Sequence, residues 1–131
     1  MNHRIAILSD IHGDTTALEA VIADARALGA TEYWLLGDIL LPGPGREDLF
    51  ELLDAILITA AVRGNWDDCV LEALDGEYGL EDPQEIQLLR LTQYLMEGLD
   101  PKRIDWLRSL PLVEKKERSE ERRVGKECRS W

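Results

Sequence analysis

Side chains that commonly bind metal ions follow three separate apolar runs of this sequence. Asp10 and His12 stand two positions apart after the first run, Asp38 follows the second, and Asn65 follows the third. Two carboxylates, an imidazole and an amide oxygen form a mixed nitrogen and oxygen ligand set. Such a set suits Mn²⁺, Fe or Zn²⁺ and not a thiolate structural zinc site. We therefore predict that these four residues bind divalent metal ions.

A ligand set of this kind favours chemistry on phosphate esters. A carboxylate placed between two ions can bridge them at a separation of about 3.5–4 Å, and such a pair clamps an in-line displacement. The ions would make hydroxide available near neutral pH and neutralise charge on the phosphoryl oxygens. Asn65 and Asp67 are the predicted catalytic residues, with Asp67 able to polarise a neighbouring group. The alternative for Asp67 is to cap a helix that begins near Cys69.

The apolar runs are the elements that must position these groups. Residues 5–9, 33–36 and 58–62 are short and apolar, which predicts strands, and the first is expected to be buried on both faces. Each run ends in a polar cluster, and in open α/β sheets ligands bind at the carboxyl ends of the strands. Folding would thus bring Asp10 and Asn65 to one rim although they lie 55 positions apart.

Helical patterns lie between and after the predicted strands. A capping-box pattern at Thr16 predicts the start of a first helix, which closes at Gly29. Residues 46–56 carry an apolar stripe at helical spacing, and further helices are expected after Pro83 and Pro101. The alternation of strand and helix predicts an α/β fold with right-handed parallel connections.

The composition is that of one soluble globular domain, with 45% hydrophobic and 31% charged residues. No apolar run reaches the roughly 18 residues of a membrane span, and the first run is too short for a secretory signal, so a cytoplasmic location is expected. Residues 1–113 carry a net charge of −13, which repels nucleic acid. The expected partner is a small phosphorylated substrate, whose negative charge bound metal ions would offset. Binding to nucleic acid or to a membrane is not expected, and the oligomeric state is left open.

Residues 114–131 differ in character from the rest of the chain. They carry 7 basic and 5 acidic side chains, and residues 114–123 include no apolar residue, so they cannot bury an apolar face. Residues 111–113 look like the start of a strand that does not continue. We predict a folded domain over residues 1–113 and a charged tail over residues 114–131 that is disordered or foreign to the domain.

Three motifs resemble the first three motifs of the calcineurin-like metallophosphoesterases: SDIHG at residues 9–13, LGD at 36–38 and RGNWD at 63–67. They occur in the family's order, each at a predicted strand end, and cover about the first two thirds of that fold. The resemblance implies the N-terminal part of a β-sandwich flanked by helices, with the second sheet largely missing. It also implies two divalent ions, with Mn²⁺ favoured. Asp10 and His12 would hold one ion, Asp38 would bridge, and Asn65 would hold the second.

The sequence departs from the family pattern in two ways. Trp66 stands where the family's third motif has a histidine, and tryptophan has no titrating nitrogen. The family's later histidine motifs are absent, since His3 and His12 are the only histidines. The second ion would therefore keep only Asp38 and Asn65, and two protein ligands hold an ion poorly. We expect a C-terminally truncated chain with little or no activity, whose intact form hydrolyses a phosphodiester, nucleotide or phosphoprotein.

Several interpretations stay open from the sequence alone. The chain can be a non-catalytic metal-binding or interaction module of the same fold, or an α/β fragment whose acids are surface charge. Asp14 can orient the metal ligands or interact with a helix dipole, and Arg63 can hold a phosphate or form a structural salt bridge. Trp66 can pack at the rim or stack on a base, and the stiff loop at residues 42–45 can shape the pocket or simply turn the chain.

Overall fold

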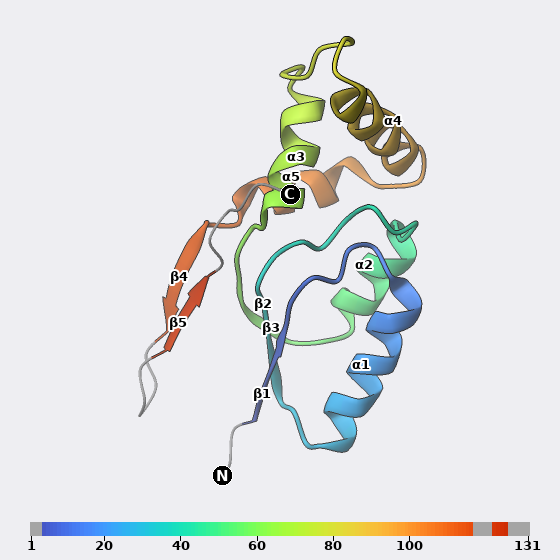
Figure 1. The fold of residues 1–131 in the computed structure, drawn as a ribbon. Coiled ribbons are helices and arrows are strands. Elements are labelled where there is room, and N and C mark those ends of the chain that lie inside the picture. The colour runs from blue at the N-terminus through green and yellow to red at the C-terminus, as the bar shows by residue number, and fades with distance from the viewer. Residues whose placement is uncertain (1–3, 117–121, 126–131) are drawn as a thin grey trace.

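A computed structural model describes residues 4–116 and 122–125 of the chain. Its centre is a parallel sheet of three strands, β1 (Ile5–Leu8), β2 (Glu32–Leu35) and β3 (Ile58–Ala61), in the order β1-β2-β3 (Figure 1). The register pairs Ile7 with Trp34 and Trp34 with Ala60. The predicted parallel α/β arrangement is confirmed, with strand limits that differ from the prediction by one residue.

Helices connect the strands and cover one face of the sheet. Figure 1 shows α1 (Thr15–Ala27) and α2 (Glu47–Asp54) on the same side of the three strands. Three more helices lie beyond the carboxyl ends of the strands: α3 (Asn65–Leu74), α4 (Pro83–Glu97) and α5 (Pro101–Ser109). α4 and α5 each begin with proline, after an aspartate whose side chain accepts a backbone N–H of the first turn.

The core divides between the two faces of the sheet because side chains alternate along a strand. Tyr33 and Leu35 belong to the large cluster that the helices cover, whereas Trp34 packs with Ala60 and Val62 on the other side. All of these side chains are buried. The large cluster extends into the helices beyond the strand ends and therefore anchors the loops that follow the strands.

Two sequence predictions about local structure were wrong. Ile7 is 55% exposed on the face of the sheet that points away from the helices, so β1 is not buried on both faces. Helix α1 is capped by Asp14, whose Oδ1 accepts the N–H of Ala17 at 3.0 Å, and not by Thr16. The capping contact supports the dipole interpretation of Asp14 over a role beside the metal ligands.

A second, two-stranded antiparallel sheet joins β4 (Val113–Lys116) and β5 (Arg122–Gly125). The backbone N–H of Ala61 donates to the Glu114 carboxylate at 3.2 Å, which ties β4 to β3. The strand expected to stop at Val113 thus continues to Lys116. The domain limit at residue 113 stays a prediction, and residues 117–121 and 126–131, with His3 at the other end, lie outside the described residues.

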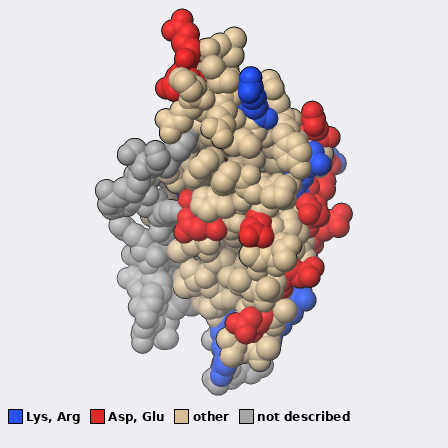
Figure 2. All heavy atoms as spheres, turned by 45° about the vertical axis from the view of Figure 1, so that its right-hand side comes forward, with Lys and Arg blue, Asp and Glu red and all other residues tan. Residues whose placement is uncertain are grey.

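Figure 2 shows more acidic than basic side chains on the face it displays, in line with the net charge of −11. Over the described part of the chain, no helix is both long enough and apolar enough to span a membrane.

Candidate metal centre

The loops that follow β1 and β2 are joined through their backbones. The N–H of His12 donates to the carbonyl of Asp38 at 2.7 Å, and the N–H of Gly13 donates to the carbonyl of Ile39 at 2.8 Å. A longer bond of 3.3 Å runs from the N–H of Asp10 to the carbonyl of Gly37. These bonds fix the relative positions of the two loops, and so of the ligands that they carry.

The loop at residues 42–45 holds the other side of the His12 turn. The N–H of Gly43 donates to the carbonyl of His12 at 2.8 Å, and the N–H of Gly45 donates to that of Gly13 at 2.7 Å. Gly13 has a φ of +71°, and a Cβ there would lie 2.5 Å from the Gly43 carbonyl oxygen. The close approach requires glycine. The loop is therefore more than a plain turn, because it fixes the backbone of a predicted ligand.

Three predicted ligands adopt an uncommon backbone conformation. Asp10, His12 and Asp38 have φ values of +56°, +51° and +53°. Residues other than glycine rarely have positive φ, although aspartate and histidine tolerate it better than most. Such strain is found preferentially at functional sites, where the surrounding structure imposes it. Here the hydrogen bonds between the loops supply that constraint.

The same three side chains converge. One ligand atom from each of Asp10, His12 and Asp38 lies within 4.8 Å of the others. His12 Nε2 is 3.4 Å from Asp10 Oδ1 and 3.9 Å from Asp38 Oδ2. The Asp38 residue is 2% exposed, whereas 53% of the Asp10 side chain is exposed. The cluster thus has one buried carboxylate and one that faces solvent.

The orientation of the His12 ring suits a metal ligand. Its Nδ1 lies 2.9 Å from the carbonyl oxygen of Leu41. A carbonyl can only accept, so Nδ1 carries the proton and Nε2 faces the carboxylates. Ligating histidines commonly fix their free nitrogen in this way. Two ligand atoms of one ion lie roughly 3–3.5 Å apart when each is about 2.1 Å from the ion. The separation of 3.4 Å between His12 Nε2 and Asp10 Oδ1 already falls in this range. The three residues therefore fit a divalent cation.

Asp67 lies behind this cluster, fully buried. Its Oδ2 accepts the backbone N–H groups of Asp38 at 2.8 Å and Gly64 at 2.9 Å, and its Oδ1 accepts that of Ile39 at 2.9 Å. Burial raises the pKa of Asp67 to about 6, against the effect of these hydrogen bonds, which lower it. The bond from Gly64, the residue before α3, makes Asp67 a cap of this helix, as the alternative interpretation expected, and its catalytic role stays a prediction. The carboxylate is occupied by backbone groups, and it supports the Asp38 turn.

Asn65 is the first residue of α3, so the helix begins four residues before the predicted start at Cys69. Trp66, the residue after Asn65, contacts the Asp38 turn, since its N–H donates to Asp38 Oδ1 at 3.0 Å. The start of α3 therefore lies at the same rim as the cluster. The assignment of Asn65 as a ligand and catalytic residue stays a prediction.

Trp66 packs against the predicted ligand His12. The two ring centroids are 5.9 Å apart with an interplanar angle of 81°, an edge-to-face contact. Trp66 is partly buried against the main core, which supports the packing interpretation of this residue. The ring restricts the movement of His12 without offering a group that titrates.

Arg63 has structural partners. Its Nε donates to Asp68 Oδ1 at 2.9 Å, and a terminal nitrogen donates to the carbonyl of Arg108 at 3.1 Å. The guanidinium thus links the end of β3 to α3 and α5. These contacts favour the salt-bridge interpretation of Arg63 over a phosphate contact.

Sequence reasoning missed three groups that shape the centre: the Leu41 carbonyl, the hydroxyl of Ser9 and the absent side chain of Gly64. Ser9 Oγ donates to Asp10 Oδ2 at 2.9 Å. A Cβ on Gly64 would lie 2.2 Å from Asp38 Oδ1. Ser9 and Gly64 belong to the motifs SDIHG and RGNWD, so the sequence could have indicated that they contribute to the site. The Leu41 carbonyl could not be found in this way, because every residue type has a backbone carbonyl.

Comparison with known proteins agrees with this geometry. A family model described as calcineurin-like phosphoesterase matches residues 3–125. A solved structure, a metallophosphoesterase from Sphaerobacter thermophilus, is 31% identical with a TM-score of 0.64, over 86% of this chain and 42% of that one. The chain thus spans less than half of the length of this structural relative. A comparison with curated proteins gave no match. The family match covers nearly the whole chain, and the protein belongs to the calcineurin-like phosphoesterase family.

Proposed function

We propose that this chain is a metal-dependent phosphoesterase that uses divalent ions, with Mn²⁺ favoured, to hydrolyse a small phosphodiester. The observation that carries the proposal is the convergence of Asp10, His12 and Asp38, whose ligand atoms lie within 4.8 Å of one another. Two carboxylates beside an imidazole form a ligand set that suits a divalent cation, and such an ion would offset their charge. Membership of the phosphoesterase family supplies the reaction class.

Each residue of the cluster has a distinct task in the proposal. His12 presents Nε2, because Leu41 fixes Nδ1. Asp38 is nearly buried and held by the N–H of Trp66, so it would offer a fixed negative charge to the bound ions. Asp10 is exposed and lies on the side from which a substrate would approach. The second ion would rely on Asp38 and Asn65.

The ions, when bound, supply an activated hydroxide and neutralise charge on the phosphoryl oxygens. The protein offers no titrating group at Trp66 to protonate a leaving group, so substrates with good leaving groups are favoured. The strongly acidic surface disfavours large polyanions and is compatible with a small substrate. We expect slow turnover from this chain, since two protein ligands hold the second ion weakly.

The test measures the affinity for Mn²⁺ and then the rate of hydrolysis of a chromogenic phosphodiester. Metal-free protein is titrated with Mn²⁺ by calorimetry and then assayed with bis(p-nitrophenyl) phosphate. Asp38→Asn and His12→Gln are the test variants, and Asp105→Asn, at an exposed position on α5, is the control. We expect the control to bind Mn²⁺ like the parent and the test variants to bind about 100-fold more weakly. A parent chain that binds no Mn²⁺ overturns the proposal.

A non-catalytic metal-binding module is the second candidate. The edge-to-face contact of Trp66 with His12 favours it, because the ring stands at the position of the family's usual histidine. The same experiment separates the two functions. Mn²⁺ binding at one site per chain without hydrolysis supports the module, whereas hydrolysis that falls in parallel with Mn²⁺ affinity in Asp38→Asn supports the enzyme.

A further inference from the structure

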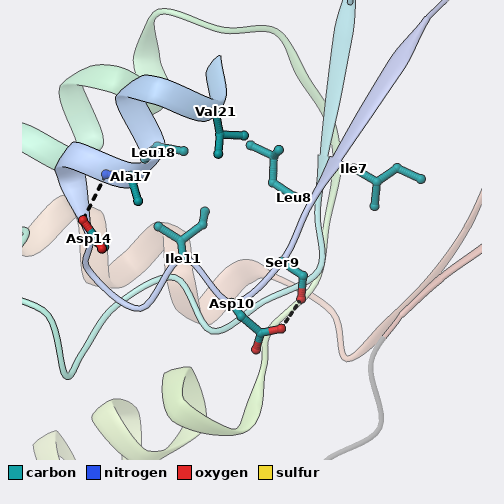
Figure 3. A pocket seen from close by; sticks show the side chains of 9 residues that line it. All are labelled: Ile7, Leu8, Ser9, Asp10, Ile11, Asp14, Ala17, Leu18 and Val21. Carbon is teal, nitrogen blue, oxygen red and sulfur yellow. Dashed lines mark hydrogen bonds between the residues drawn. The ribbon is translucent and has the colours of Figure 1, made fainter. Parts of the chain in front are cut away.

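Ser9 makes a side-chain contact with a predicted ligand. Its Oγ lies 2.9 Å from Asp10 Oδ2, and Figure 3 shows both side chains on the loop that follows β1, among the residues that line a cavity between β1 and α1. A carboxylate at neutral pH only accepts hydrogen bonds, so the hydroxyl donates. Hydrogen bonds to an ionised acceptor are stronger than those between neutral groups.

The two oxygens of Asp10 therefore have different surroundings. Oδ2 accepts from Ser9, whereas Oδ1 is 3.4 Å from His12 Nε2, inside the cluster of ligand atoms. The Asp10 side chain is 53% exposed, so burial alone does not fix its rotation. A rotation that exchanged the two oxygens would break the Ser9 contact, and an ion bound through both would share Oδ2 with the Ser9 hydroxyl.

We propose that Ser9 is a positioning residue that holds Asp10 so that only Oδ1 binds the cation, a role that depends on the metal site proposed above. Binding through one oxygen leaves more of the coordination shell of the ion for water or substrate than binding through two. Orientation by an outer hydrogen-bond partner also strengthens metal binding, and loss of such a partner typically costs 10–100-fold in affinity.

The experiment uses Mn²⁺ alone with the full chain. Ser9→Ala removes the hydroxyl and Ser9→Thr retains it, while Ser109→Ala removes the hydroxyl that donates to the Trp106 carbonyl at the end of α5. We expect Ser9→Ala to bind Mn²⁺ about tenfold more weakly, and Ser9→Thr and Ser109→Ala to stay within about twofold of the parent chain. Urea unfolding of the metal-free proteins should be alike for all four.

A spectroscopic readout separates positioning from a general structural role. In the infrared difference spectrum between Mn²⁺-bound and metal-free protein, a carboxylate bound through one oxygen has a wider separation of its two stretching bands than one bound through both. We expect the separation to narrow in Ser9→Ala and to be retained in Ser9→Thr.

Three results would overturn the inference. Equal Mn²⁺ affinity in Ser9→Ala and the parent chain removes the role of the hydroxyl while leaving the metal site intact. A Ser9→Thr variant as weak as Ser9→Ala shows that side-chain size matters and the hydrogen bond does not. A parent chain that binds no Mn²⁺ overturns both this inference and the proposed function.

Discussion

The carboxylate of Asp67 accepts the backbone N–H of Asp38 at 2.8 Å, so the first turn of α3 holds the turn that presents a predicted metal ligand. The same oxygen accepts the N–H of Gly64 at 2.9 Å. One buried side chain thus joins the segments that follow β2 and β3, 29 residues apart in the chain. The relative position of these segments decides whether a metal site forms.

Asp67→Asn should therefore destabilise the protein and weaken metal binding together. An amide has one oxygen in place of two, so at least one backbone N–H behind Asp38 loses its acceptor in a buried position. We expect the free energy of unfolding to fall by about 3 kcal/mol, because unsatisfied buried donors are costly. Urea denaturation of metal-free protein measures this loss. Asp105→Asn, an exposed position, should leave the unfolding midpoint unchanged.

Gly64→Ala should have a related effect through packing. A Cβ at this position would lie 2.2 Å from Asp38 Oδ1 and 2.5 Å from the Asp38 nitrogen. Since the start of α3 and the Asp38 turn cannot both keep their positions, we expect a loss of about 2–3 kcal/mol in unfolding free energy and weaker Mn²⁺ binding. Urea denaturation and calorimetry measure the two effects.

Gly79→Ala is the matched control for this substitution. No heavy atom lies within 4 Å of the Cβ that it adds. Its unfolding free energy should stay within about 0.5 kcal/mol of the parent value. Equal losses in the two variants would show that an added methyl group lowers stability at either position, and that the contact with Asp38 does not explain the effect.

The gathering of ligands was predictable because Asp10, His12 and Asp38 each follow a strand of one parallel sheet. Strand type and order follow from short apolar runs separated by helical patterns, and ligand position follows from the strand ends. The resemblance to a family added the expected pairing of ligands with ions.

Other features depend on contacts distant in sequence, which residue patterns do not specify. Ile7 is exposed because it lies on the face of the sheet opposite the helices, and apolarity alone predicted burial. Asp67 looks like any acid near a helix start, and its role appears only when β2 and β3 lie side by side. The continuation of β4 through charged residues likewise depends on its partner β5.

Mn²⁺ should stabilise the folded chain, because a ligand that binds only the native state shifts the unfolding equilibrium. At a concentration 100 times the Kd the gain is about 2.7 kcal/mol, which corresponds to a rise of roughly 10 °C in Tm for a chain of this size. Thermal unfolding followed by circular dichroism, with and without Mn²⁺, measures this rise. In Asp38→Asn, with a Kd about 100-fold higher, the rise should fall to roughly 2 °C, and persistence of the full rise would place the bound ion elsewhere.

The exposed edge of β1 should promote self-association. Ile7 is 55% exposed on an edge strand, and apolar edge strands offer unpaired backbone groups to other chains. Ile7→Lys should reduce aggregation measured by light scattering, with a change in unfolding free energy below about 1 kcal/mol. Leu80→Lys makes the same exchange at a position that is 78% exposed and lies outside the strands. If both variants reduce aggregation equally, added charge explains the effect and the edge of β1 does not.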